Sequence, residues 1–313
     1  MITRFEQITE AVADYPLRTV AVAVAEKKPI IEAVKVAMEM DIARPLLVGR
    51  REVIEPLAQE VGLDLAGIEL IDEPDDLQAA RQAALAVREG RADLLMKGHI
   101  HTDDFLRAIL DKETGLRSGY IMSHVFILEA LDRGRLTFIT DGAMNIAPDL
   151  TTKGDIIMNA VYLARCFGIN RPKVGVLAAV EVVNPKMPAT LDAAALTTMA
   201  ARDQLPDCIV DGPFALDDAV SAMAVEIKGI KGEVAGNCDI LLVPDIEAGN
   251  ILVKSFTFLA NGRVAGVLVG AAAPVILTSR ADSAEARLYS MAAAVLMANL
   301  RRSERLKIGR VHF

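Results

Sequence analysis

The feature that most constrains the fold is a regular alternation of short apolar runs, rich in β-branched residues, with longer segments of helical period. Segments 28–40, 76–88 and 153–167 carry apolar residues at helical spacing. The strand candidates between them are apolar without interruption, as expected where helices cover both faces of a sheet. They lie at 18–24, 45–49, 67–71, 92–96, 135–140, 173–180, 207–211, 239–244, 264–270 and 274–278. The alternation therefore predicts an α/β fold with largely parallel sheets.

One part of the chain does not follow this alternation clearly. The stretch 119–136 fits a strand pair, an exchanged strand or the end of a helix. A final helix is expected over roughly 283–302, where apolar residues again recur at helical spacing.

Composition excludes several classes of protein. The 313 residues carry a net charge of −8 and no basic stripe interleaved with aromatics, which argues against a nucleic-acid partner. Cys166, Cys208 and Cys238 are widely spaced and odd in number, so a disulfide framework is not expected. The N-terminal residues lack the apolar run of a signal peptide, and no apolar run reaches the ~20 residues of a membrane span. These features predict a cytoplasmic protein with no membrane partner.

Polar residues, often followed by the start of a helix, come directly after six of the predicted strands. The segments are KGHIHTDDFLRA after 92–96, DGAMNIAPD after 135–140, EVVNPKMPATLD after 173–180, DGPFALD after 207–211, PDIEAGN after 239–244 and SRADSAEA after 274–278. Ligands of open parallel sheets bind outside the carboxyl ends of the strands. Helix N-termini gathered there present unpaired N–H groups and a partial positive charge. The pattern indicates an enzyme with an anion-binding cleft.

Five positions in the segments after 92–96 and 274–278 are candidates for a structural role or for a role in the site. Lys97 is either a phosphate ligand or an ordinary solvated lysine. Thr102 is expected to cap a helix whose first turn contains two acids, with or without a ligand contact. Asp282 and Glu285 have the spacing of a capping box. Arg280 fits a structural role least well, because it follows a strand end and precedes a helix cap.

A second set of polar candidates follows the strands in the middle of the chain. Asp141, Asn145 and Asn250 either hold their loops through bonds to the backbone or contact substrate. Asn184 is a further candidate for binding phosphate or substrate, in the segment before Pro188, which suits the start of a helix.

Familiar cofactor motifs are absent from the sequence. No GxGxxG follows a strand and no GxxxxGK[ST] occurs, so a plain dinucleotide or P-loop site is unsupported. His99 and His101 lie two residues apart, without a third residue spaced to complete a metal site. No metal is therefore expected.

Six segments together resemble the phosphate acetyl/butyryltransferase family and run in the family's order. They are MKGHIHTDDFLRAIL, TDGAMNIAPDLTTKGDI, EVVNPKMPATLDAAAL, VDGPFALDDAVS, DILLVPDIEAGNILVKSF and PVILTSRADSAEARLYS. The NPKMPATLDAA and TSRADSAEA forms are more similar to the phosphate butyryltransferase branch. The resemblance implies two α/β domains similar in fold to the isocitrate/isopropylmalate dehydrogenases. One comprises 1–140 plus 272–313 and the other 141–271, with the active site in the cleft between them. It also implies a homodimer or higher homo-oligomer.

The reaction that the resemblance implies is the reversible conversion of acyl-CoA and inorganic phosphate into acyl phosphate and CoA. Coenzyme A is then a substrate, and no cofactor is needed. Ser279 and Arg280 match the family's Ser-Arg pair, which implies that Arg280 binds phosphate and developing negative charge. Ser279 would donate a hydrogen bond to the phosphate or to the carbonyl oxygen. Thr102 matches a position on the phosphate side.

One departure from the family concerns the general base, the group that would accept the proton of the CoA thiol. The acetyltransferase branch carries Asp seven residues after the Ser, where this sequence has Ala286. Glu285 is adjacent, but helical geometry turns it about 100° away. Butyryl is expected as the favoured acyl group, and direct transfer without an acyl-cysteine is expected because the cysteines lie in apolar surroundings. The alternatives are phosphate acetyltransferase, a hydroxyacid dehydrogenase on the same fold, and an acyl-CoA-binding relative without activity.

Overall fold

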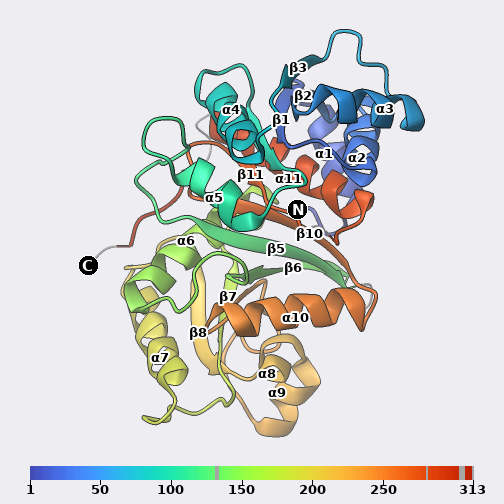
Figure 1. The fold of residues 1–313 in the computed structure, drawn as a ribbon. Coiled ribbons are helices and arrows are strands. Elements are labelled where there is room, and N and C mark those ends of the chain that lie inside the picture. The colour runs from blue at the N-terminus through green and yellow to red at the C-terminus, as the bar shows by residue number, and fades with distance from the viewer. Residues whose placement is uncertain (131–133, 280, 303–306, 312–313) are drawn as a thin grey trace. The chain divides into compact units, whose positions relative to one another are not determined.

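Figure 1 shows the computed structural model, which describes residues 1–130, 134–279, 281–302 and 307–311. The chain forms two compact units. Unit 1 comprises Met1–Arg4, Ile121–Val264 and Glu304–Phe313, and unit 2 comprises Phe5–Tyr120 and Ala265–Ser303. The long segments of the two units meet at 120–121 and 264–265, whereas the predicted domain bounds lie at 140–141 and 271–272. The placement of an active site between two domains stays a prediction.

Unit 2 is an α/β unit whose strands follow the order β3-β2-β1-β4-β11-β10. Its strands are β1 (Arg18–Ala23), β2 (Ala43–Gly49), β3 (Glu69–Asp72), β4 (Leu94–Lys97), β10 (Arg263–Val269) and β11 (Val275–Ile276). All neighbouring pairs are parallel except β10 with β11. Its helices are α1 (Glu6–Ala13), α2 (Lys28–Glu39), α3 (Arg51–Val61), α4 (Asp76–Arg88), α5 (Thr102–Leu110) and α11 (Ala284–Arg302).

The helices of unit 2 pack in two groups. Helix α11 contacts α1 and α2, and α2 contacts α3, whereas α4 packs on α5 and on β1 and β2. The chain moves outward from β1 to β3 and then returns to β4 beside β1. Because parallel crossovers are right-handed, this reversal puts the two groups of helices on opposite faces. It also leaves the carboxyl ends of β1 and β4 at the point where the strand order reverses, where open α/β sheets bind ligands.

Unit 1 is a second α/β unit, with strand order β5-β6-β9-β7-β8. Its strands are β5 (Ser123–Ala130), β6 (Arg135–Thr140), β7 (Lys173–Leu177), β8 (Ile209–Phe214) and β9 (Ile240–Leu242). Its helices are α6 (Leu150–Cys166), α7 (Pro188–Ala201), α8 (Leu216–Val220), α9 (Ala222–Lys228) and α10 (Ile246–Phe258). Strands β6 to β9 are parallel, and α7 and α8 both contact β8, on whose two sides they appear in Figure 1.

The structure confirms the predicted fold class of α/β units with largely parallel strands. It also settles the ambiguous stretch 119–136, whose described part contains β5 paired antiparallel with β6. The expected start of a helix at Pro188 is confirmed, since proline occupies the first turn of α7. Among the described residues, no helix is long and apolar enough to cross a membrane.

Candidate active site

The carboxyl ends of β4 and β11 bring two predicted site segments together in unit 2. The strands are parallel and pair Ile276 with Met96, so Lys97 and the residues after Ile276 leave the sheet at the same edge. Lys97 is only 2% exposed, and its ammonium lies 3.4 Å from the carbonyl oxygen of Gly98. The interpretation of Lys97 as an ordinary solvated lysine is therefore wrong. A buried ammonium at this edge supplies positive charge in surroundings that screen it weakly.

Gly98 fixes the path of the chain away from β4. Its N–H donates to the carbonyl oxygen of Ala23 over 2.8 Å, and the N–H of His99 donates to that of Val24 over 2.8 Å. A Cβ at position 98 would lie 2.3 Å from each of these two oxygens. Only glycine fits so close to the end of β1. The turn at Gly98 therefore sets the direction in which the chain runs from Lys97 toward α5.

The start of α5 differs from the prediction in one respect. Helix α5 begins at Thr102, and the residue at the cap position is His101, which makes no capping bond through its side chain. The prediction that Thr102 caps this helix is wrong, because Thr102 is already helical. Asp103 and Asp104 do lie in the first turn, as predicted. The exposed Thr102 side chain remains a candidate for phosphate contact.

Ser279 lies in a tight turn between β11 and α11. The carboxylate of Asp282 accepts the N–H of Ser279 over 2.7 Å, and the N–H of Asp282 donates to the carbonyl oxygen of Ser279 over 3.2 Å. The cap of α11 is Ser283, whose Oγ accepts the N–H of Ala286 over 3.1 Å. The predicted capping box of Asp282 and Glu285 is therefore wrong, because Asp282 closes the preceding turn instead. Arg280 lies outside the described residues.

A second cluster lies after β6 in unit 1, around the buried carboxylate of Asp141. One oxygen accepts the N–H groups of Ala143 and Met144 over 3.0 and 3.1 Å. The other accepts the backbone N–H and the side-chain amide of Asn145 over 3.1 and 2.7 Å. Asn145 also donates to the carbonyl oxygen of Met122 over 2.9 Å. The interpretation of Asp141 and Asn145 as holders of their loop is confirmed, and a substrate contact by either stays a prediction.

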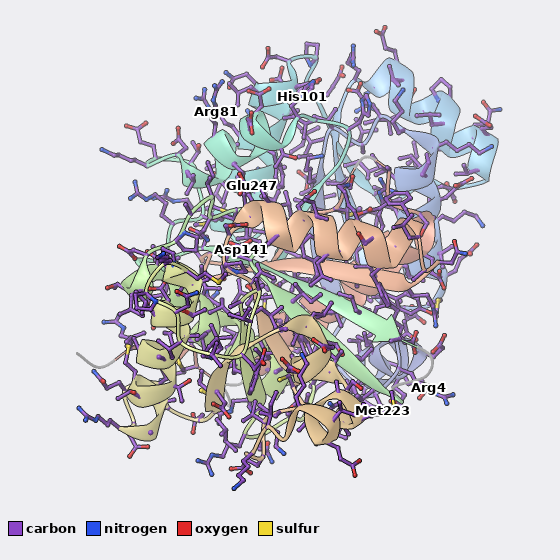
Figure 2. The ribbon with its side chains drawn as sticks, turned by 90° about the horizontal axis from the view of Figure 1, so that it is seen from below. Arg4, Arg81, His101, Asp141, Met223 and Glu247 are labelled. Carbon is purple, nitrogen blue, oxygen red and sulfur yellow. The ribbon has the colours of Figure 1, made fainter. Side chains whose placement is uncertain are left out.

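Asn250 joins this cluster from helix α10. Its amide donates to the carbonyl oxygen of Gly142 over 3.3 Å. A Cβ on Gly142 would lie 2.8 Å from the carbonyl carbon of Gly249, so the backbones of loop and helix touch directly. Figure 2 shows Asp141 near the N-terminal end of α10, where Glu247 lies. Asp141 and Asn145 are thus hydrogen-bonded to each other, and Asn250 binds the backbone of the same loop at Gly142.

Asn184 lies in the loop between β7 and α7, outside this group of hydrogen bonds. Its Oδ1 accepts the N–H of Lys186 over 3.0 Å, and its own N–H donates to the Oγ of Thr190 over 2.9 Å. These bonds shape the entry to α7. Because β6, β9 and β7 are parallel neighbours, Asn184 follows the same edge of the strands as Asp141 and Asn250.

Sequence reasoning missed a charged group after the first two strands of unit 2. Glu26, 5% exposed, accepts the backbone N–H of Arg50 and its guanidinium Nε, both over 2.8 Å. Loss of contact with water raises the pKa of the nearby Asp76 carboxyl, and the negative charge of Glu26 raises it further. The positive charge of Arg50 acts in the opposite direction. A charged residue soon after an apolar strand, in VAVAE and LLVGR, was the available signal.

Cys166, Cys208 and Cys238 are buried, as predicted from their apolar surroundings. Burial raises the pKa of the Cys166 and Cys208 thiols to about 12. Both thiols are therefore protonated at pH 8 and poorly nucleophilic. We expect the folded protein to resist iodoacetamide at pH 8 and to react at three thiols in denaturant, as counted by mass spectrometry. Rapid alkylation of the folded protein would show that a thiol is accessible and reopen an acyl-cysteine route.

Neither His99 nor His101 belongs to a metal-binding cluster in the part of the chain that the structure describes. Within that part, no group of three or more His, Cys, Asp and Glu side chains is placed to hold a metal ion.

Comparison with known proteins identifies the family. The model of the phosphate acetyl/butaryl transferase family matches residues 76–295, well over half of the chain. The chain belongs to this family. The match includes the turn after β4, the Asp141 cluster and the segment from Ser279 into α11.

Individual members of the phosphate acetyl/butaryl transferase family match nearly the whole chain. The phosphate butyryltransferase of Clostridium acetobutylicum is 47% identical over 298 residues, covering 95% of this chain and 99% of that protein. The phosphate acetyltransferase of Rhizobium meliloti is 43% identical, covering 95% of this chain and 93% of that protein. The predicted family is thus confirmed.

Solved structures agree with the family assignment. A branched-chain phosphotransacylase from Enterococcus faecalis has a TM-score of 0.80 at 34% identity, covering 90% of this chain and 99% of that one. A 4-hydroxythreonine-4-phosphate dehydrogenase from Klebsiella pneumoniae has a TM-score of 0.53 at 13% identity, covering 90% of this chain and all of that one. The second likeness concerns the fold alone, and it confirms the predicted relation to a dehydrogenase fold.

Proposed function

We propose that this protein transfers a short acyl group reversibly between coenzyme A and inorganic phosphate, with butyryl favoured over acetyl. One observation carries the proposal: a phosphate butyryltransferase matches this chain at 47% identity, with 95% and 99% of the two chains covered. The Enterococcus faecalis branched-chain phosphotransacylase supports a short branched acyl group as a further substrate. Because one methylene is worth only ~1–3 kcal/mol in a hydrophobic pocket, neighbouring chain lengths are expected to react more slowly rather than not at all.

The proposed reaction is a direct acyl transfer. In one direction a phosphate oxygen attacks the thioester carbonyl, a C–O bond forms, the C–S bond breaks and CoA leaves as a thiolate. In the other direction the CoA thiolate attacks the acyl phosphate and phosphate leaves. Both directions pass through a tetrahedral intermediate whose oxyanion needs fixed donors. The acyl carbon changes nucleophile without any change in oxidation state, so the proposed reaction needs no redox cofactor, and coenzyme A is a substrate. The proposal includes no metal.

The residues at the β4 and β11 edge suit this chemistry. Among the described residues, the Ser279 hydroxyl donates to none, and its oxygen accepts the N–H of Ala281 over 3.4 Å. Its hydrogen is therefore available for a phosphate or carbonyl oxygen. Arg280 follows directly, and a guanidinium binds phosphate oxygens with two parallel hydrogen bonds. The buried Lys97 adds positive charge at the same edge.

The proposal assigns no protein base at position 286. Ala286 is buried in the first turn of α11, so no carboxylate is available there. In the direction that makes acyl phosphate, the proton of the attacking hydrogen phosphate can pass to the departing thiolate. In the reverse direction, an oxygen of the phosphate group accepts the proton of the CoA thiol. It thereby takes the role that a carboxylate at position 286 would have.

We further propose a cytoplasmic homo-oligomer. Three buried, reduced cysteines suit a reducing compartment, where thiols persist.

Thiol release from acyl-CoA tests the proposed function directly. Purified protein is mixed with butyryl-CoA, and free CoA is followed with a thiol reagent in buffers with and without phosphate. We expect release only with phosphate, and a lower kcat/KM when acetyl-CoA replaces butyryl-CoA. Equal release in the two buffers would instead indicate a hydrolase, and tight CoA binding without any release would indicate a binding protein.

A further inference from the structure

Arg287 on α11 is a charged side chain that binds the backbone of the turn that begins at Ser279. It is 4% exposed although it carries a guanidinium. Its Nη2 donates to the carbonyl oxygen of Ser279 over 3.0 Å, and its Nη1 donates to those of Asp282 and, over 3.2 Å, Ser283. One side chain therefore binds three carbonyl oxygens of the segment that begins at Ser279.

These bonds require arginine specifically. The guanidinium is a flat fork whose N–H groups point in fixed directions, so it can bind separated carbonyls at once. Burial lowers the pKa of this guanidinium, and the negative charge of Asp282 opposes that shift. Desolvating a charge is costly unless hydrogen bonds compensate it, so the turn and the arginine depend on each other.

The same turn is held from its other side by Asp282, which accepts the N–H of Ser279. The carbonyl oxygens of Ser279, Asp282 and Ser283 and the N–H of Ser279 are thus all hydrogen-bonded. Because the N–H and the carbonyl oxygen of Ser279 are both bound, its backbone is fixed and its hydroxyl can leave the backbone in few directions.

We propose that Arg287 is a positioning residue for phosphate: it fixes the backbone of Ser279, Asp282 and Ser283 so that the Ser279 hydroxyl meets a phosphate oxygen in one orientation. The inference rests on the proposed function. Misplacement by ~1 Å can cost ~10²-fold in rate, so loss of Arg287 is expected to act chiefly through phosphate. A purely structural role would lower stability while leaving the kinetics of the folded protein unchanged.

The test compares Arg287→Ala with Arg301→Ala. Arg301 is a matched control, because it lies on the same helix and donates to a backbone carbonyl, that of Ala271, over 2.9 Å. For Arg287→Ala we expect kcat/KM for phosphate to fall ~30–100-fold, with KM for butyryl-CoA within about threefold of wild type. For Arg301→Ala we expect less than a threefold change in either parameter, given the ordinary scale of such effects.

Three further measurements separate positioning from folding. Arg287→Lys keeps a buried positive charge without the fork, and we expect it to fold with a kcat/KM for phosphate between wild type and Arg287→Ala. Guanidinium chloride at a non-denaturing concentration should raise the kcat/KM for phosphate of Arg287→Ala by at least about fivefold. NaCl at the same concentration should not raise it. Phosphate should raise the melting temperature of wild type more than that of Arg287→Ala, a readout that needs no turnover.

The outcomes are distinct. Normal phosphate kinetics in Arg287→Ala with a lowered melting temperature, or an equal loss in Arg301→Ala, would overturn the positioning role while leaving the proposed function intact. If wild type shows neither phosphate-dependent thiol release nor stabilisation by phosphate, both the function and this inference are wrong. If wild type is stabilised by phosphate but releases no thiol, the function alone fails, and the stabilisation measurement still decides the role of Arg287.

Discussion

Replacing Arg280 by alanine is expected to lower kcat/KM for butyryl-CoA and phosphate by at least ~10²-fold, the scale typical of losing one fixed donor to a developing negative charge. The reason is that the guanidinium is expected to bind phosphate and the oxyanion together. We expect kcat to fall, because the charge is greatest in the transition state, and KM for phosphate to rise, because a phosphate ligand is lost. Steady-state thiol release at varied phosphate concentration measures both.

The control for this variant is Arg107→Ala. Arg107 is an exposed arginine on α5 that pairs with Asp104 over 3.2 Å, and its side chain is 71% exposed. Because such surface pairs contribute little, activity and melting temperature should stay near wild type. Turnover within threefold of wild type for Arg280→Ala would remove this residue from the proposed chemistry.

Replacing Asp141 by alanine is expected to give the largest loss of stability, about 2–4 kcal/mol in the free energy of unfolding of unit 1. The buried carboxylate accepts three backbone N–H groups and one amide, and alanine leaves these donors without their partner. The loop from Gly142 to Asn145 should then open, with the contact to α10 lost. Hydrogen exchange of the Ala143, Met144 and Asn145 amides, together with calorimetry, measures both effects.

Asp149→Ala is the matched control for Asp141→Ala. Asp149 is an exposed aspartate that caps α6 by accepting the N–H of Thr152 over 2.8 Å. Its removal should lower the melting temperature less and leave exchange in the 142–145 loop unchanged. Faster exchange in that loop without a fall in stability would mean that the Asp141 carboxylate organises the loop but does not support the fold.

The fold was predictable because strand and helix signals along the chain agree with one another. Continuous apolar runs such as the one ending in β4 mark strands covered on both faces, and polar segments after them mark the ligand edge. The antiparallel pair of β5 and β6 was one of three alternatives for its stretch, since an apolar run followed by a turn is compatible with strand or helix until its partner is known. Register and pairing are long-range properties that a local pattern does not contain.

The sequence predicted which residues belong to the candidate site better than it predicted what each of them does. The sequence correctly selected Asp141 and Asn145 as loop holders, but it assigned helix capping to Thr102 and Asp282, each of which lies one residue from the true cap. Helix boundaries are uncertain by that amount, because capping residues are equally good turn residues. The burial of Lys97 and Arg287 depends on packing in three dimensions. For Arg287, its place within the otherwise apolar run of α11 was the only signal.

Helix α11 is hydrogen-bonded to the backbone both before and after the two-residue strand β11. Arg301 binds the carbonyl of Ala271 ahead of the strand, and Arg287 binds that of Ser279 beyond it. The two arginines are fourteen positions apart, a rise of about 21 Å. Inserting or deleting one residue between them would swing one guanidinium by about 100° around the helix axis relative to the other. This part of the gene should therefore accept substitutions far more readily than changes in length, and alignment gaps within it would mark members that anchor the segment differently.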